Sequence, residues 1–480
     1  MTTPTALDAL LLLESSPLKA GQPAQTHAVV RLEAQGRPDR KRPPLDLVAC
    51  IDVSGSMSGA KLEAVRRALH ALGSELSGQD RLGLTTFESE VRQALPPTAM
   101  DGEGKAQLRA AVDRLVPMGS TFMSGGLLGA LDDLHAAPAP AEGAVRRVLL
   151  FTDGHANQGL GEADRDAWAK LLATQLRGTS VSWFGFGEDH DAEFLAFLAD
   201  LSGGNAYVAK NADAISDAFA QELGGLLGVR AMDITVTVEV KGGSATLLNE
   251  ESHAHKDGRL EVKLADLSCE ERRDLVFALS VPAGAADAPP LSLSVRVRFR
   301  DVVTGERQQA ELQASAPFTA GEAGPQRREV TEAAALVFAG TAQGRARAFA
   351  EQGRWRDAEQ AILEAVTRLE AVGSARAAAM AGQLRRLSSE YGDPVVYGTS
   401  KSKLMASRRA FSKQRSSGSD MDAFFTTDAK REMQVRFRRH QEAEGAPVDP
   451  GLVRQLEQEM VAHLREALTR ARVRGPRRSH

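Results

Sequence analysis

Residues 45–57 read LDLVACIDVSGSM. A mostly apolar run ends at Asp52, and Ser54 and Ser56 follow at once. Such a run predicts a buried strand that leads into a loop carrying one carboxylate and two hydroxyls. Oxygen ligands of this kind suit a hard cation such as Mg²⁺. The stretch therefore predicts one half of a metal site at the end of a strand.

Two later stretches can supply the other half of this site. Residues 119–121 (GST) precede a helix-like run over 123–135, and residues 148–154 (VLLFTDG) form another apolar strand that ends on an acid, Asp153. In open parallel sheets, ligands bind beyond the carboxyl ends of the strands. We therefore expect Thr121 and Asp153 to lie beside the carboxylate and the serines of the first stretch.

The three motifs together resemble the von Willebrand factor A domain and its metal-ion-dependent adhesion site. The pattern of that site is DxSxS, then a threonine, then an aspartate after a hydrophobic strand. The residues that match it are Asp52, Ser54, Ser56, Thr121 and Asp153. The resemblance implies that hydroxyls touch the ion directly, while the two carboxylates act largely through water. The alternative is an inherited fold that has lost its metal.

An ion with few directly bound anions stays electrophilic towards an incoming carboxylate. The resemblance thus implies Mg²⁺, or else Mn²⁺ or Ca²⁺, that grips an Asp or Glu of a partner protein. The layout of the whole chain is also similar to von Willebrand A proteins of the inter-α-trypsin inhibitor heavy chain and calcium-activated chloride channel regulator type. That likeness is close over the A domain and loose over the flanks.

Strands and helices alternate from residue 45 to about 227, which predicts an α/β fold with a doubly wound, mostly parallel sheet. Apolar residues at helical spacing from Leu62 to Leu76 predict a helix after the first motif. Residues 81–87 read as the next strand, and residues 91–95 as an antiparallel edge strand. The sequence thus predicts a Rossmann-like domain with the site at one edge of its sheet.

The flanks predict an antiparallel β-sandwich and a C-terminal helical region. Period-two alternation separated by Gly, Pro and Asp turns marks the strands after residue 230, and we expect one strand within 22–35 to join them. His253 and His255 fall in a polar loop, where a metal role would need two further ligands. Trp355 lies in a stretch that resembles one tetratricopeptide-type helical hairpin, with Gly353 at its turn. The expected domains are 1–44, 45–227, 228–320, 325–392 and 393–480.

The tail from residue 396 is basic. It holds 18 Lys or Arg against 10 Asp or Glu, whereas the preceding residues hold 41 against 53. Residues 399–422 read as disordered, and apolar residues from Leu452 to Leu468 predict an amphipathic helix. Such a tail can dock on an acidic protein, bind nucleic acid or an anionic membrane, or fold back on the acidic body. No recognised nucleic-acid motif is present, so we disfavour nucleic acid.

The remaining features favour a cytoplasmic, bacterial protein that is not an enzyme. Cys50 and Cys269 read as two reduced, buried thiols. No apolar run is long enough to cross a membrane, and no leader is convincing. The common catalytic signatures are missing, and the GxG at residues 185–187 lacks a third glycine. We expect a metal-dependent interaction scaffold. The alternatives are an adaptor of a MoxR-type AAA+ ATPase and a metal-dependent hydrolase.

Overall fold

The computed structural model describes residues 6–36, 42–141, 143–187, 191–209, 212–397, 404, 407–408 and 428–443. The chain divides into two compact units. The first comprises Met1–Lys41, Ala192–Val208 and Val229–Phe425, and the second comprises Arg42–Asp191, Ala209–Gly228 and Thr426–His480. The amphipathic helix predicted for the tail lies outside the described residues, and so does the segment predicted to be disordered, apart from residues 404, 407 and 408.

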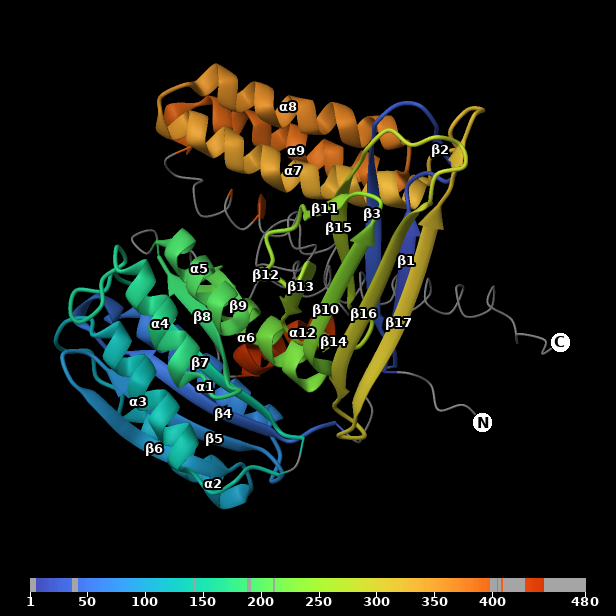
Figure 1. Ribbon diagram of the computed structural model, residues 1–480. Coiled ribbons are helices and arrows are strands. Elements are labelled where there is room, and N and C mark those ends of the chain that lie inside the picture. The colour runs from blue at the N-terminus through green and yellow to red at the C-terminus, as the bar shows by residue number, and fades with distance from the viewer. Residues whose placement is uncertain are drawn as a thin grey trace. The chain divides into compact units, whose positions relative to one another are not determined.

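The predicted α/β fold is confirmed by a mostly parallel sheet with the strand order β6-β5-β4-β7-β8-β9 (Figure 1). The central strand β4 (Leu45–Asp52) runs parallel to β5 (Arg81–Phe87) on one side and to β7 (Val145–Thr152) on the other. Every residue of β4 is buried, as its apolar run requires. Next to β7 lies β8 (Ser180–Phe186), and β9 (Gly203–Ala209) ends the order.

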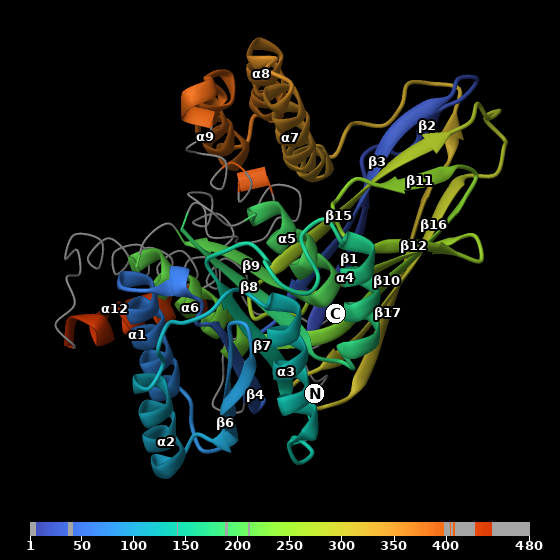
Figure 2. The ribbon, with the colours of Figure 1, turned by 90° about the vertical axis from the view of Figure 1, so that its left-hand side faces the viewer.

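The predicted antiparallel edge strand is also confirmed. It is β6 (Val91–Ala99), which pairs with β5 and extends beyond the predicted residues. Helices cover both faces of the sheet, and α3 packs directly on β4 and β5 (Figures 1 and 2). The helices of this α/β region are α1 (Ala60–Glu75), α2 (Gly102–Asp113), α3 (Met123–Ala136), α4 (Arg165–Gln175), α5 (Ala192–Ser202) and α6 (Ala212–Leu227).

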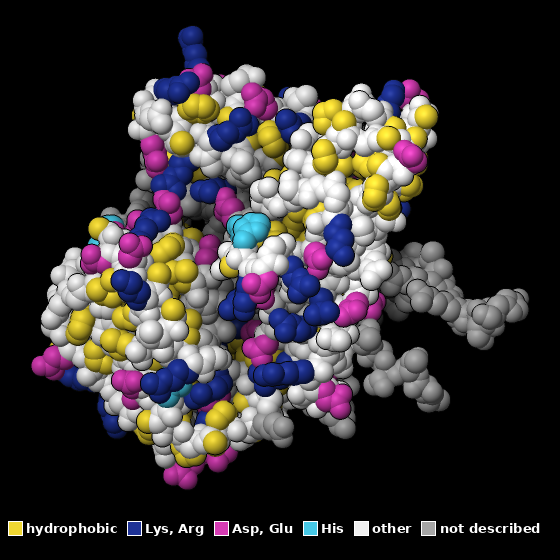
Figure 3. Space-filling model, viewed as in Figure 1, with side chains coloured by type: hydrophobic (Ala, Val, Ile, Leu, Met, Phe, Trp, Pro, Cys, Tyr) yellow, Lys and Arg dark blue, Asp and Glu magenta, His cyan; other side chains and the backbone are white. Residues whose placement is uncertain are grey.

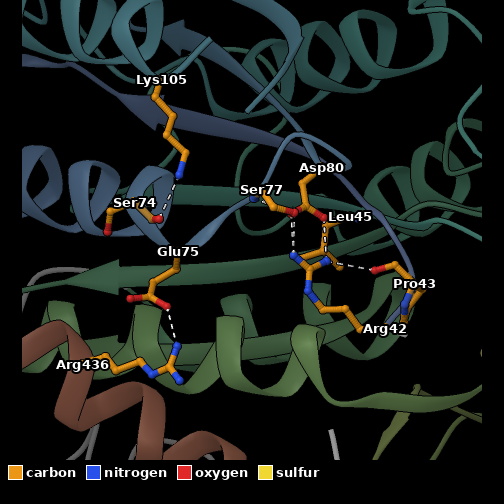
Figure 4. A network of polar contacts seen from close by, with 9 residues as sticks. All are labelled: Arg42, Pro43, Leu45, Ser74, Glu75, Ser77, Asp80, Lys105 and Arg436. Carbon is orange, nitrogen blue, oxygen red and sulfur yellow. Dashed lines mark hydrogen bonds and ion pairs between the residues drawn. The ribbon is translucent and has the colours of Figure 1, made fainter. Parts of the chain in front are cut away.

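A buried carboxylate fixes the start of β4. Asp80 accepts hydrogen bonds from the Leu45 backbone N–H at 2.9 Å, from Arg42 Nη1 at 2.6 Å and from the Ser77 backbone N–H at 2.8 Å (Figure 4). Burial alone would raise the pKa of Asp80, but these bonds outweigh it and lower the pKa. The ionised group therefore ties the entry of β4 to the loop before β5. This holds the strand whose other end carries Asp52.

The predicted antiparallel sandwich is confirmed in the first unit. One sheet has the order β1-β3-β15-β11, and the other has the order β12-β13-β10-β16-β17 with β14 beside β10. Apolar residues from both sheets share one core. The strands are β1 (Leu7–Leu13), β3 (Ala24–Ala34), β10 (Val229–Lys241), β11 (Ser244–Leu247), β12 (His253–Lys256), β13 (Arg259–Leu264), β14 (Leu267–Ser268), β15 (Arg272–Val281), β16 (Leu291–Asp301) and β17 (Arg307–Ala316). A separate short pair joins β2 (Leu18–Lys19) to β18 (Phe318–Thr319) in parallel.

The N-terminal residues contribute more than the single strand that the sequence predicted. β3 pairs with β15 over ten residues, and β1 pairs with the opposite edge of β3. β1 includes the short apolar run at Leu10–Leu13, for which no strand was predicted. β1 thus adds an edge strand to this sheet.

The stretch with His253 and His255 is a strand rather than the predicted polar loop. β12 pairs with β13, and both histidines are exposed. On the outer face of the same sheet, Lys and Arg side chains gather over β10 and β16 (Figure 3). Three of them, Arg296, Arg298 and Arg300, alternate along β16 with buried residues. This alternation places one face of the strand in the core and the other in solvent.

Three consecutive helices form the predicted helical region. They are α7 (Arg328–Glu351), α8 (Trp355–Val372) and α9 (Ala375–Gly392), and α8 packs against both of its neighbours (Figure 2). Gly353 turns the chain between α7 and α8 at φ +74, a backbone conformation that favours glycine. Ala358 is completely buried, as a close helix crossing requires. The region rests on the sandwich through α7, where Val330 and Val337 meet apolar residues of β1, β3 and β15.

An ion-pair network lies on the sheet that carries β3 and β15. Asp274 is buried and accepts hydrogen bonds from Arg31 Nε at 2.8 Å and from Arg272 Nε at 3.1 Å. Burial alone would raise the pKa of Asp274, but the two arginines lower it. The carboxylate is therefore held ionised inside the protein.

One helix of the tail was not predicted. α12 (Asp428–Ala443) packs against α6 and, less extensively, α1 within the second unit. Arg438 is buried and pairs with Asp217, whereas the half-exposed Arg436 bonds to Glu75 at 3.0 Å (Figure 4). Part of the basic tail thus docks on acidic residues of the α/β domain. Among the described residues, no helix is long and apolar enough to span a bilayer.

Candidate metal centre

Asp52 ends the central strand of the sheet and is completely buried. Its Oδ1 accepts a hydrogen bond from the Ser54 backbone N–H at 2.8 Å, and its Oδ2 accepts one from Thr152 Oγ1 at 2.7 Å. Thr152 ends β7, the neighbouring parallel strand. The carboxylate is thus oriented by its own loop and by the adjacent strand.

The two serines lead from Asp52 to the second carboxylate. A short 3-10 turn over Gly55–Met57 follows β4 and turns the Ser56 side chain towards the end of β7. Ser56 Oγ donates to Asp153 Oδ1 at 2.8 Å and lies 3.1 Å from Ser54 Oγ. The DxSxS motif and the aspartate after β7 are therefore in direct contact, although 97 residues separate Ser56 from Asp153.

Thr121 lies in the loop before α3, and backbone hydrogen bonds place this loop beside the DxSxS turn. Gly55 N–H donates to Gly119 O at 3.3 Å, and Met118 N–H donates to Val53 O at 2.7 Å. A Cβ built on Gly154 would lie 3.7 Å from Thr121 Oγ1 and 3.8 Å from Ser56 Oγ. All five predicted site residues thus gather at the carboxyl end of the sheet.

The donor set fits a hard divalent cation with a mixed shell of hydroxyls, carboxylates and water. Burial, together with the nearby charge of Asp153, raises the pKa of Asp52 to about 6. A buried anion of this kind is stabilised by a cation. Across the part of the chain that the structure describes, no cluster of three or more His, Cys, Asp and Glu could hold a metal. Hydroxyls must therefore supply several of the ligands in any metal site built here.

Sequence reasoning missed Lys61, which also contacts the site. The lysine lies in the first turn of α1, and its Nζ donates to Asp153 Oδ2. The side chain of Asp153 is completely buried, whereas that of Lys61 is about one third exposed. A lysine in an amphipathic helix reads as a solvent-facing residue, so the sequence carried no signal for this contact. The only hint was that α1 begins directly after the DxSxS loop.

The rim of the site is open and mixed in character. Ser56 is exposed, so a ligand can reach the hydroxyl that touches Asp153. The apolar side chains of Val116 and Met118 are also exposed on the loop before Thr121. In the loop after Asp153, His155 Nδ1 lies 2.5 Å from Glu162 Oε1. The site therefore presents apolar and polar contact area around its hydroxyls.

Comparisons with known proteins identify the family of the domain that carries these residues. The family model described as the von Willebrand factor type A domain matches residues 46–221. The E3 ubiquitin-protein ligase WAV3 of Arabidopsis thaliana is 31% identical over 329 residues, which are 62% of this chain and 40% of WAV3. Inter-alpha-trypsin inhibitor heavy chain H1 of Mesocricetus auratus is 30% identical over 222 residues, which are 44% of this chain and 23% of that protein. The chain thus spans less than half of the length of these relatives.

A solved structure shares the fold beyond the A domain. It is the von Willebrand factor type A protein from Catenulispora acidiphila, with a TM-score of 0.63 and 18% identity. The similarity covers 78% of this chain and 88% of that one. The fold is therefore shared over most of the length of both proteins.

Proposed function

Because residues 46–221 form a von Willebrand factor type A domain, we propose that this chain is a divalent-metal-dependent protein-interaction scaffold. Asp52, Ser54, Ser56, Thr121 and Asp153 would hold Mg²⁺, and the bound ion would supply an electrophilic position for an Asp or Glu of the partner. The observation that carries the proposal is the contact of Ser56 with Asp153 at 2.8 Å, beside the buried Asp52.

Residues of the chain orient the site, limit its negative charge and leave it accessible. The hydrogen bonds to Asp52 from Ser54 and Thr152 fix its orientation before any ion arrives. Hydroxyls outnumber carboxylates in the donor set, so little negative charge from the protein opposes an incoming carboxylate. The open rim at Ser56 gives the partner access.

The ion alone cannot account for tight binding. A strong hot-spot contact contributes about 2 to 4 kcal/mol, while a nanomolar complex requires about 12 kcal/mol. The loops at 55–60, 118–124 and 154–162 must supply the remaining contact area. Exposed Met118 and Val116 give the partner an apolar surface beside its acidic residue.

We do not transfer the activity in the name of WAV3 to this chain. The matched region covers 40% of that protein, and the chain has two cysteines, too few for a zinc site built from four thiolates. We propose that the shared region serves binding rather than catalysis. A non-enzymatic role in the cytoplasm is part of this proposal.

The test is affinity purification with the full chain in Mg²⁺ or in EDTA. Thr121→Ala and Asp52→Ala should lose the partners that wild type loses in EDTA. Thr98→Ala is a matched control, because Thr98 lies on β6 and its hydroxyl bonds to the backbone of Pro96. Partners retained by the folded site variants would refute a metal-dependent role for the A domain.

The identity of the captured protein separates the alternatives. A MoxR-type AAA+ ATPase that is lost in EDTA would make the chain an adaptor of that enzyme. Hydrolytic turnover that depends on Asp52 would instead support the hydrolase hypothesis.

A further inference from the structure

Lys61 and Asp153 form an ion pair inside the candidate metal centre. The ammonium donates to Asp153 Oδ2, while Ser56 Oγ donates to Oδ1 of the same carboxylate at 2.8 Å. Both oxygens of Asp153 are therefore occupied by donors from the DxSxS turn and from α1. A divalent ion that approaches Asp153 meets a positive charge already bound there.

The stability of α1 does not explain a lysine at this position. Lys61 is the second residue of the helix, and a helix N-terminus favours acidic rather than basic side chains. The N-cap residue is Gly59, so no side-chain cap offsets the unfavourable position of the lysine. The buried carboxylate of Asp153 is the group that accounts for the orientation of Lys61.

The end of β8 borders the ammonium on another side. Gly187 has a φ of +85, and a Cβ built there would lie 3.5 Å from Lys61 Nζ and 3.6 Å from its Cε. The lysine side chain thus passes beside a glycine to reach Asp153. Its partial exposure leaves a path by which the ammonium can swing into solvent when another cation takes its place.

We propose that Lys61 is a built-in competitor that sets the affinity of this centre for divalent ions. The inference rests on the proposed function, because it concerns the same site. In the metal-free protein, Lys61 is the counter-ion of Asp153. It thereby reduces the repulsion between the buried carboxylates of Asp52 and Asp153. When a divalent ion binds, Lys61 must leave Asp153 or remain beside a second positive charge.

The size of the effect follows from the charges. A monovalent and a divalent cation about 5 Å apart repel each other strongly enough, even at the dielectric constant of water, to change an affinity by about tenfold. Displacement of the lysine into solvent reduces the repulsion but breaks its ion pair with a buried carboxylate. Removal of the charge should therefore tighten metal binding by about tenfold.

The experiment measures Mn²⁺ binding to the full chain by calorimetry or by electron paramagnetic resonance of free Mn²⁺. Lys61→Met keeps the length of the side chain and removes its charge, and Lys61→Arg keeps the charge. Lys105→Met is the matched control, because Lys105 of the same unit donates to Ser74 O at 3.0 Å, away from the site (Figure 4). Circular dichroism establishes that each variant is folded.

We expect Lys61→Met to bind Mn²⁺ about tenfold more tightly than wild type, with Lys61→Arg and Lys105→Met within about twofold of it. Suppose that wild type binds Mn²⁺ and Asp52→Ala does not. Equal or weaker binding by folded Lys61→Met would then refute the role of Lys61 and leave the metal site itself intact. Binding by Lys61→Met but not by wild type would support the proposal in its strongest form. Absence of binding in every protein would refute the metal site and this inference together.

Discussion

Replacing Asp52 by Asn should stabilise the metal-free protein, although it removes a site residue. Asp52 is buried, and its pKa is raised from 3.8 to about 6 by burial and, to a lesser extent, by Asp153. At neutral pH the carboxylate is ionised in both the folded and the unfolded chain, so the folded state carries the cost of burying the charge. A difference of this size between the two pKa values corresponds to roughly 3 kcal/mol.

Asparagine fits the hydrogen-bond pattern around this position. Its side-chain oxygen can accept from the Ser54 N–H as Oδ1 of Asp52 does. Its amide N–H can donate to Thr152 Oγ1, which now donates to Oδ2. The threonine hydroxyl can reverse its role because the Gly154 carbonyl lies 3.4 Å away as an alternative acceptor. The variant thus removes the charge without leaving a buried donor or acceptor unpaired.

The assay is thermal unfolding in EDTA and in Mg²⁺, between pH 4.5 and pH 8. In EDTA at pH 7.5, Asp52→Asn should unfold about 6 to 12 °C above wild type, since 1 kcal/mol shifts the midpoint of a domain of this size by about 2 to 4 °C. The advantage should shrink as the pH falls from 6 towards 4, because wild-type Asp52 then takes up a proton on folding and loses its penalty. Saturating Mg²⁺ should stabilise wild type and leave the variant unchanged.

Two results would refute this reasoning. If Asp52→Asn is no more stable than wild type in EDTA at pH 7.5, the carboxylate is not buried as an uncompensated charge. If Mg²⁺ stabilises both proteins equally, the ion binds elsewhere. Asp52→Ala serves as a comparison, because it removes the charge but also leaves the Ser54 N–H and the Thr152 hydroxyl without this acceptor.

Two further predictions concern the ion pairs outside the site. Arg438→Ala should release α12 and increase its proteolysis, at a cost of about 3 kcal/mol, because the substitution leaves a buried pair incomplete; half-exposed Arg436→Ala is the control and should cost less than about 1 kcal/mol. Asp274→Asn should destabilise the sandwich by about 3 to 5 kcal/mol at pH 7, measured by chemical unfolding, because two arginines then lose the buried carboxylate that they share. Since the pKa of Asp274 is lowered, its contribution is complete above pH 4 and is lost at more acidic pH, so a difference that grows on acidification would contradict the argument.

The α/β fold and the gathering of the site residues could be predicted because both follow from local patterns. Each strand of the central sheet is a short apolar run bounded by turns, and a fully buried parallel strand needs such a run. The carboxyl ends of parallel strands share one edge, so the residues after β4 and β7 must meet there. That rule brings Ser56 and Asp153 to 2.8 Å without any knowledge of distant contacts.

Two strands, β1 and β12, were not predicted. The first is defined by its pairing with another strand, and the second is indicated by its turn. β1 carries four consecutive leucines, Leu10–Leu13, so period-two alternation is absent and only its pairing with β3 defines it as a strand. β12 ends at Lys256 and is followed by Asp257 and Gly258, both of which have positive φ. An Asp-Gly pair is a strong hairpin signal. It predicts that the residues before it form a strand that pairs with β13, not a loop.

Lys61 and α12 could not be predicted for a different reason. The side chain of Lys61 is placed by the direction in which α1 leaves the DxSxS turn, and a helical repeat does not encode that direction relative to β7. α12 is a strongly polar helix whose buried face includes Met433, Val435 and Phe437. Its docking depends on α6, about two hundred residues earlier in the chain, so no local pattern indicates that it packs on the domain.

The charges of the proposed centre favour cooperative binding, in which the metal and the partner each strengthen the binding of the other. Two buried carboxylates would face a bound ion, and one of them already holds Lys61, so the protein alone would offer the metal little net negative charge. A partner carboxylate would add an anion and would favour the displacement of the lysine. Because binding free energies are linked reciprocally, a partner that tightens metal binding must itself bind more tightly in the presence of the metal. We therefore expect weak metal binding by the isolated chain and strong binding in the complex, which would make the partner and the ion jointly necessary for assembly.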